Sequence, residues 1–343
     1  MIKVFDRRTI LQGTTALGAA ALTSSPFDAF AMAKYPAKDI NVMVGTREGG
    51  GADRNLRLIT GVWKNYLKVN FEASFYPGAA GRVGYQKYMG LAKDDGYTLL
   101  FGNMGPETLN WVVSEPKGFS FPGDYVYFNQ VDLDPSVIFV SAKKPQFNTI
   151  DELVAEGKKR TINVGVSRLA HPASLGVLAM AKHLGIQVNL IPLSGGKNTR
   201  KGVATGEMDC GALPSGGIAR KYKGFKTIAT FSLEKAEGDY AKRIYDAPMV
   251  NQKFGMNLPA LASARAFAVK TSFTKKHPER FEKLLKTGEA VIKDPAFKKA
   301  VLKAKAPWNL IKYGSPADCA AYAKEIMAVG KDFAGLMSSK KKK

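Results

Sequence analysis

The stretch "DINVMV" (39–44), followed by "GTREGGGADRNLR" (45–57), predicts the unit from which the fold is built. Its first part is a short apolar run rich in β-branched residues, which is typical of a buried strand. Three consecutive glycines, Gly49 to Gly51, come next. Beyond them, apolar residues recur at helical spacing: Leu56, Ile59, Trp63, Tyr66 and Leu67. We therefore expect a strand, a tight glycine turn and a helix.

The glycine turn does not match the nucleotide-binding loops. A triphosphate loop needs a lysine and a hydroxyl residue after its last glycine, whereas Ala52, Asp53 and Arg54 follow here. A dinucleotide loop spaces its glycines, and these are consecutive. The turn still lets a ligand approach the backbone, and the start of the next helix offers unpaired N–H groups. A small anion is the favoured ligand, and a turn without a ligand is the alternative.

Short strand-like runs alternate with longer amphipathic runs along the chain. One series spans residues 39–159, in which 125–131 and 136–142 are expected as two separate strands before a helix that Thr149 can cap. A second series begins at residue 162. This alternation predicts an α/β fold of two domains with a cleft between them, each a mostly parallel sheet covered by helices. The lysine-rich helices near the C-terminus are expected to return to the first domain.

Further helix starts follow strand-like runs in both halves. They are "YPGAAGRVG" (76–84), "SRLAHPASL" (167–175) and "PLSGGKN" (192–198). The positive ends of several helix dipoles, brought together from both halves, would form a positive cleft. Such a cleft suits a carboxylate.

The N-terminus reads as an export signal. Arg7 and Arg8 precede "ILQGTTALGAAAL", which is too short to span a membrane permanently, and small residues at Ala29, Ala31 and Ala33 provide cleavage sites. Paired arginines are typical of the twin-arginine signal. An ordinary secretory signal with a chance arginine pair is the alternative. We expect residues 1–33 to be removed and the mature chain to be periplasmic.

Composition excludes several classes of function. Cys210 and Cys319 form neither a disulfide framework nor a metal site, although sequence leaves open whether they pair, and the three histidines share no ligand spacing. We expect no metal and no cofactor. The formal net charge of +22 favours anionic partners. Because the lysines are scattered over helix-like stretches, and not gathered in one patch with aromatics, we do not expect nucleic-acid binding.

Several motifs together resemble one family. "VGTREGGGADRNLR", "YPGAAGRVG", "AKDDGYTLL", "IPLSGG" and "GEMD" have the order and spacing found in the periplasmic solute-binding receptors of tripartite tricarboxylate transporters. The resemblance covers about residues 38–335. It implies a two-lobed, periplasmic-binding-protein-like (Venus flytrap) α/β fold, with lobe 1 at 34–140 and 265–337, lobe 2 at 141–264, and a basic tail at 338–343. It also implies a monomer that closes around an organic acid anion and delivers it to membrane transporter subunits.

The resemblance assigns ligand-binding positions by motif. The residues it implies are Gly49, Gly50, Gly51, Ala52 and Asp53 in the first cradle, Asn103 and Met104 after a strand, Ser167, Ala170, His171 and Ser174 at the turn of the second lobe, Gly195, Gly196 and Lys197 in the next loop, and Asp209 near the hinge. Asp53 has two possible roles: it could contact an amino group of the ligand, or it could cap the helix.

The chain departs from the family pattern at two kinds of position. Thr46 and Arg47 stand where an aromatic and a small residue are usual, and Ser174 stands where histidine is common. Arg47 could pair with a second carboxylate or point to solvent, and Arg168 and Lys197 have the same two readings. If two of these three face the cleft, the ligand is a dianion.

Carboxylate binding for transport is therefore the leading interpretation. One alternative keeps the fold and makes the chain a ligand-sensing partner of a membrane sensor kinase. Another is an exported enzyme, for which His171 and Ser174 are a Ser/His pair with no orienting acid nearby in the sequence. We expect no catalysis.

Overall fold

The computed structural model describes residues 35–114 and 123–338. The expected export signal at 1–33 lies outside the described residues, as does the basic tail apart from Ser338. Residues 38–343 form a compact unit separate from residues 1–37, and the elements below all belong to it. In the part of the chain that the structure describes, no helix is long and apolar enough to cross a membrane.

The first half of the unit is built on five strands: β1 (Ile40–Val44), β2 (Phe71–Phe75), β3 (Thr98–Asn103), β4 (Tyr125–Ser141) and β9 (Ala262–Lys270). Their order is β2-β1-β3-β9-β4, in which the first three are parallel and β9 is antiparallel to both of its neighbours. A short strand, β10 (Ile311–Gly314), also pairs with β4. We call this half lobe 1.

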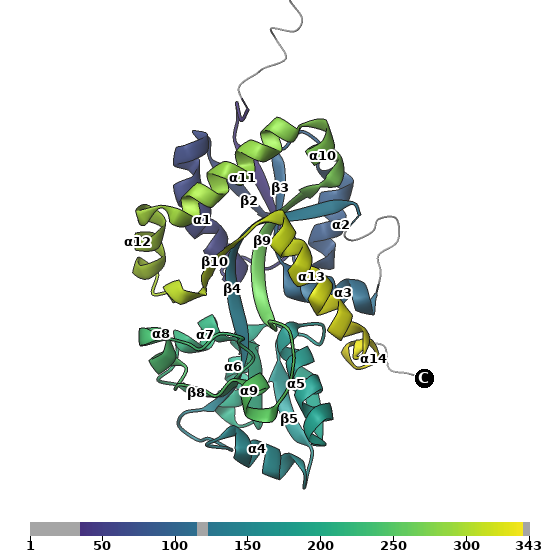
Figure 1. Ribbon diagram of the computed structural model, residues 1–343, viewed down its shortest axis with the longest axis vertical. Coiled ribbons are helices and arrows are strands. Elements are labelled where there is room, and N and C mark those ends of the chain that lie inside the picture. Colours follow the sequence, from purple (N-terminus) through teal and green to yellow (C-terminus); the bar gives the residue numbers. More distant parts are fainter. Residues whose placement is uncertain (1–34, 115–122, 339–343) are drawn as a thin grey trace, which may run out of the picture. The chain divides into compact units, whose positions relative to one another are not determined.

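Helices from both ends of the chain cover lobe 1 (Figure 1). They are α1 (Gly51–Leu67), η1 (Ala79–Gly81), α2 (Arg82–Leu91), α3 (Met104–Val113), α10 (Thr271–Lys276), α11 (Pro278–Lys293), α12 (Pro295–Lys303), η2 (Trp308–Leu310), α13 (Pro316–Lys331) and α14 (Ala334–Met337). The indole N–H of Trp63 in α1 donates to Thr287 Oγ1 in α11 over 2.8 Å. The C-terminal helices thus pack on the first lobe.

The second half, lobe 2, has the same plan. It contains β5 (Ile162–Val166), β6 (Val188–Pro192), β7 (Cys210–Pro214) and β8 (Phe225–Thr230), with α4 (Ile150–Gly157), α5 (Pro172–Leu184), α6 (Gly196–Thr205), α7 (Ser215–Ala219), α8 (Gly238–Arg243) and α9 (Val250–Phe254) around them. Strands β6, β5 and β7 are parallel, and β7 and β8 pair with the last residues of β4 in antiparallel fashion.

Strand β4 differs from the sequence expectation. Two strands were expected at 125–131 and 136–142, but one 17-residue strand runs through both. Its residues up to Pro135 pair with β9, and those from Ser136 onward pair with β7 and β8 of lobe 2. The residues between the two expected strands, "DLDP" (132–135), belong to β4, and Asp132 and Asp134 are buried against an arginine of β9. The lobe boundaries at 140/141 and 264/265 stay predictions.

Local capping follows the sequence. Thr149 accepts a hydrogen bond from the N–H of Glu152, as predicted, and α5 begins at Pro172. Helix α3 was not predicted, because its third residue is Pro106. A proline is tolerated there, since the first N–H groups of a helix have no partner within it.

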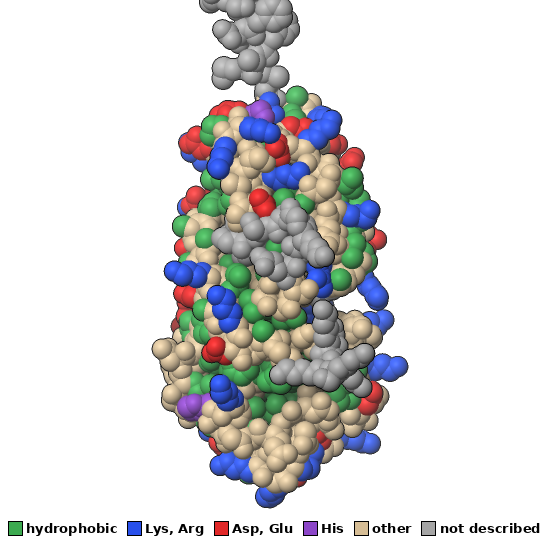
Figure 2. All heavy atoms as spheres, turned by 90° about the vertical axis from the view of Figure 1, so that its right-hand side faces the viewer, with side chains coloured by type: hydrophobic (Ala, Val, Ile, Leu, Met, Phe, Trp, Pro, Cys, Tyr) green, Lys and Arg blue, Asp and Glu red, His purple; other side chains and the backbone are tan. Residues whose placement is uncertain are grey.

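On the face shown in Figure 2, Lys and Arg side chains are dispersed among acidic ones.

An irregularity in β4 is held by close packing. The pairing of β4 with β9 shifts register between Phe128 and Asp132, and Asn129 there has a φ of 45°. Asn129 is fully buried, and its Nδ2 donates to the carbonyl of Leu284 in α11 over 2.8 Å. A Cβ on Gly288 would lie 1.8 Å from that Nδ2. Only glycine fits at position 288.

We predict that Gly288→Ala lowers the free energy of unfolding by about 1–3 kcal/mol, as overpacking of a core does. Urea denaturation followed by circular dichroism measures this. Gly61→Ala is the matched control, because Gly61 lies inside α1 with no neighbouring atom within 4 Å of an added Cβ. The control should stabilise the protein by about 0.5–1 kcal/mol. Equal effects of the two substitutions would contradict the packing described at Asn129.

A buried carboxyl group lies in the core of lobe 1. Glu107 Oε2 accepts from the hydroxyl of Tyr127 over 2.6 Å, and Oε1 accepts from the N–H of Asn103 over 2.7 Å. Burial raises the pKa of Glu107 to about 8, although these two hydrogen bonds and the charge of Arg168 lower it. A Cβ on Gly102 would lie 2.5 Å from both carboxyl oxygens, so glycine makes room for the group.

We predict that Glu107 makes the protein less stable as the pH rises from about 4.5 to about 8. In that window the folded chain keeps a proton that the unfolded chain has lost, so stability falls by up to about 1.4 kcal/mol per pH unit and levels off above. Glu107→Gln mimics the neutral acid and should remove this fall, as denaturation across the pH range would reveal. Glu325→Gln, on the exposed side of α13, is the control. A fall of the same slope in Glu107→Gln would assign it to other groups.

Candidate functional site

A cleft of about 1090 Å³ lies between the two lobes. Its walls come mainly from the loops that follow β1, β2, β5 and β6, and from the starts of the helices after them. Ligands of open α/β sheets bind at these strand ends, because the loops and helix N-termini converge there. The cleft is at the upper end of the usual volume for ligand pockets, roughly 300–1,000 Å³.

The triple-glycine loop forms one wall of the cleft. Gly49 has a φ of 72°, and its N–H donates to Asp53 Oδ2 over 2.8 Å. Asp53 also accepts from Arg57 Nε and is buried, so its carboxylate holds the loop on the first turn of α1. Among the described residues, the N–H groups of Gly51 and Ala52 have no acceptor. The turn therefore presents free donors to an anion.

The loop after β6, in lobe 2, lines the same cleft as the triple-glycine loop and has a similar structure. Gly195 has a φ of 113°, and its N–H donates to the carbonyl of Ser167 over 3.1 Å, which joins this loop to the one after β5. Within the described chain, the N–H groups of Gly196 and Lys197 at the start of α6 have no acceptor. Each lobe thus contributes one glycine-rich helix start to the cleft.

A chain of polar side chains runs along the floor of the cleft. Asn103 Nδ2 donates to Ser263 Oγ over 3.0 Å, and Ser263 Oγ lies 3.5 Å from His171 Nε2. His171 Nδ1 accepts from the N–H of Ala173 over 3.0 Å, so the neutral ring has its proton on Nε2. Burial lowers the pKa of His171, and the charges of Arg168 and Arg265 lower it further. His171 is therefore a neutral donor that caps α5.

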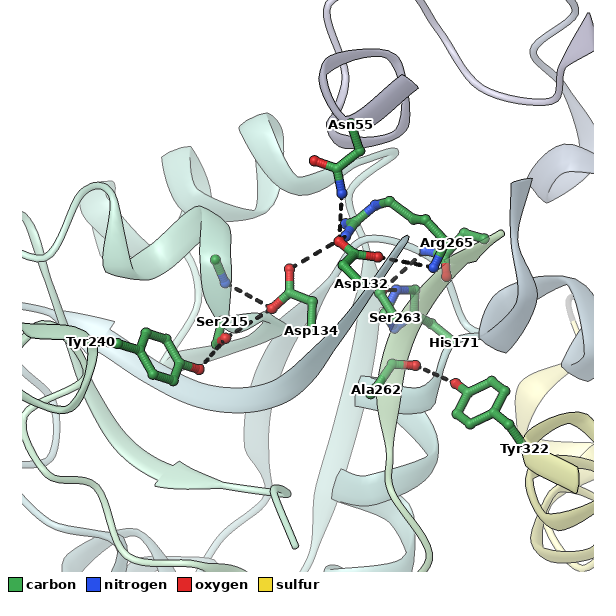
Figure 3. Close-up of polar contacts among 12 residues, drawn as sticks. Asn55, Asp132, Asp134, His171, Ser215, Tyr240, Ala262, Ser263, Arg265 and Tyr322 are labelled. Carbon is green, nitrogen blue, oxygen red and sulfur yellow. Dashed lines mark hydrogen bonds and ion pairs between the residues drawn. The ribbon is translucent and has the colours of Figure 1, made fainter. Parts of the chain in front are cut away.

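The second polar group of the floor is an ion-pair network (Figure 3). Arg265 in β9 contacts Asp132 and lies 3.7 Å from Asp134 Oδ2, and all three residues are buried. Asn55 in α1 donates to Asp132 over 2.5 Å. On the other side, Asp134 Oδ1 accepts from Ser215 Oγ and from the N–H of Gly216, both over 2.8 Å. The network joins a helix of lobe 1 to a helix of lobe 2.

Most of the residues expected at the site line this cleft. They are Thr46, Arg47, Gly49, Gly50, Gly51, Ala52, Asn103, Ser167, Arg168, Ala170, His171, Gly195, Gly196 and Lys197. Four others do not line it. Asp53 is buried and accepts from the N–H of Gly49, Met104 is fully buried, Ser174 Oγ donates to the carbonyl of Arg168 over 2.8 Å, and Asp209 accepts from Arg160 Nη1 and Nη2.

Sequence reasoning missed several charged residues of the cleft. Arg265 interrupts an apolar strand and could have been noticed there, since a charge in such a run needs a partner. Asp132 and Asp134 alternate in β4, at positions that fell between the two expected strands. Arg200 and Arg220 lie in helix-like, lysine-rich surroundings, where no local pattern distinguishes them.

The cleft is strongly cationic. Its lining has nine basic side chains against two carboxylates, Asp132 and Asp134, and both carboxylates are engaged by Arg265. In residues 35–114 and 123–338, no group of three or more His, Cys, Asp or Glu side chains could hold a metal ion. Cys210 and Cys319 are both free and buried. The cleft can therefore bind an anion through backbone N–H groups and guanidinium ions.

The fold matches solved structures of binding proteins. A TctC solute-binding protein from Polaromonas, without ligand, is 19% identical, with a TM-score of 0.69 over 88% of this chain and 99% of that one. A Rhodopseudomonas palustris protein with adipate is 18% identical (TM-score 0.73; 88% and 98% covered). MatC from Rhodopseudomonas palustris, with bound malate, is 17% identical (TM-score 0.70; 88% and 100% covered).

No protein-family model matches the sequence, and no curated protein matches it significantly. At the identities above, structural likeness establishes the fold. The chain has the two-lobed α/β fold of periplasmic binding proteins, and it is similar to the TctC solute-binding proteins over most of its length.

Proposed function

We propose that this chain is an extracytoplasmic solute-binding protein that captures an organic carboxylate, with a preference for dicarboxylates, and delivers it to a tripartite tricarboxylate-type membrane transporter. One observation carries the proposal. The cleft between the lobes combines free N–H groups at two glycine-rich helix starts with a large excess of basic side chains. Both features favour a compact anion over a neutral or cationic ligand.

The similar structures support the ligand class. Two of them contain adipate or malate, each of which has two carboxylates. The cleft of this chain has donors on both lobes, so one ligand can be held from both sides. Closure of the lobes around it would be the signal that the transporter reads. In this proposal β4 and β9 connect the lobes, and the boundaries lie near residues 140 and 264.

Two alternatives remain. A ligand-sensing partner of a membrane sensor kinase would use the same cleft, and neighbouring genes would distinguish it, because a transport receptor should be encoded beside two membrane subunits. An exported enzyme based on His171 and Ser174 is disfavoured by their hydrogen bonds. His171 Nε2 is a donor, and Ser174 Oγ donates to a backbone carbonyl. The pair therefore lacks the acceptor that would activate a serine.

We predict that dicarboxylates raise the melting temperature of the mature protein and that Arg47→Ala weakens this response. Arg47 lines the cleft, is exposed, and has no acidic partner among the described residues. A ligand at 100 times its Kd stabilises the fold by about 2.7 kcal/mol, which differential scanning fluorimetry detects. Mono-, di- and tricarboxylates, aliphatic and aromatic, form the panel.

Arg243→Ala is the matched control for this experiment, because Arg243 is outside the cleft and pairs with Asp239. Its response to ligands should equal that of the unmodified protein. If no organic acid changes the melting temperature of the unmodified protein, the proposed function is wrong. If dicarboxylates stabilise Arg47→Ala as well as they stabilise the unmodified protein, Arg47 is a surface residue.

A further inference from the structure

Three arginines outside the expected site line the cleft from opposite lobes. Arg54 comes from α1 of lobe 1, Arg200 from α6 of lobe 2, and Arg220 from the end of α7 of lobe 2. We call them the arginine cluster. Arg200 Nη1 lies close to both lobe 2 helix starts, since a Cβ on Gly196 or Gly217 would be 3.3 or 3.1 Å from it.

The cluster lacks the carboxylate partners that two other arginines of the cleft have. Arg57 pairs with Glu48 and Asp53, and Arg265 pairs with Asp132 and Asp134. In the described chain, the side chains of Arg200 and Arg220 have no hydrogen bond or ion pair, and the only polar contact of the Arg54 side chain is to the carbonyl of Gly49. The first group of arginines is thus compensated by protein carboxylates, whereas the arginine cluster is not.

The three cations are near enough to repel one another. Burial, followed by the charges of Arg220, Arg265 and Arg200, lowers the pKa of Arg54 to about 10, although the charge of Asp53 raises it. Burial also lowers the pKa of Arg200, with a contribution from Arg220. Arg54 is exposed, and Arg200 and Arg220 are half-buried. Like charges held near one another without carboxylate partners are unfavourable unless an anion from outside completes the site.

We propose that the arginine cluster binds a second anionic group of the ligand, so that the ligand is an organic acid with at least two carboxylates joined by a hydrocarbon spacer. This inference rests on the proposed function, in which the glycine loops bind the first carboxylate. Apolar side chains adjoin the cluster. A Cβ on Gly196 would lie 3.6 Å from Leu213, and one on Gly216 would lie 3.0 Å from Leu310. Both leucines line the cleft and suit the spacer.

The test is isothermal titration calorimetry of the mature protein at 150 mM salt with butyrate, succinate, adipate and tricarballylate. Arg200→Gln/Arg220→Gln removes two guanidinium groups of the cluster. Hydrogen bonds to charged groups contribute enough that we expect its Kd for the polycarboxylates to rise about 10- to 100-fold. Its Kd for butyrate should change less than about 3-fold, because a monocarboxylate uses only the glycine loops.

Lys201→Gln/Lys223→Gln is the matched control. It removes two charges from exposed positions on or near the same helices, outside the cleft. At 150 mM salt such distant charges are largely screened, so its Kd values should equal those of the unmodified protein. A rise equal to that of the arginine variant would overturn the inference, because it would reflect net charge alone.

The remaining outcomes separate the two proposals. If the unmodified protein binds no carboxylate, the proposed function fails, and the inference fails with it. If it binds butyrate as tightly as the polycarboxylates, and Arg200→Gln/Arg220→Gln has no effect, carboxylate capture stands, whereas the preference for dicarboxylates and the second anion site are wrong. Circular dichroism and thermal melts of each variant verify that the fold is retained.

Discussion

The buried contact of Arg265 with Asp132 and Asp134 is the interaction on which the arrangement of the two lobes depends. Arg265 is in β9 and the two aspartates are in β4, the strand that pairs with β9 of lobe 1 and with β7 and β8 of lobe 2. Three charges without partners would be very costly at this depth, whereas together they satisfy one another. Burial alone would lower the pKa of Arg265, but the two carboxylates outweigh it and raise that pKa.

The same network positions both walls of the cleft. Asp132 reaches α1 through Asn55, and Asp134 reaches α7 through Ser215, whose hydroxyl also contacts Tyr240. Burial raises the pKa of Asp132 to about 6; Arg265 lowers it and Asp134 raises it. Burial thus favours the neutral form of Asp132, and the ion pair with Arg265 favours the carboxylate.

The local parts of the structure were predictable, and the long-range parts were not. The β–α units, the glycine turns and the cap at Thr149 follow from spacing and residue type, because neighbours in sequence determine them. The course of β4 was mispredicted because its aspartates are polar in sequence but are paired with Arg265, 133 residues away from Asp132. The arginine cluster was missed for the same reason. Its members come from three segments, and only the fold brings them together.

Two sets of arginines in one cleft have different physical roles. When an arginine pairs with protein carboxylates, its positive charge is neutralised within the protein and attracts a ligand less. Arg57 and Arg265 are of this kind. An arginine without a carboxylate partner leaves its charge available, and desolvation strengthens its attraction to an anion. The large positive charge of the chain therefore acts on anions in two different ways. Scattered surface lysines raise the rate at which anions arrive, whereas in our proposal the arginine cluster determines which anions are retained.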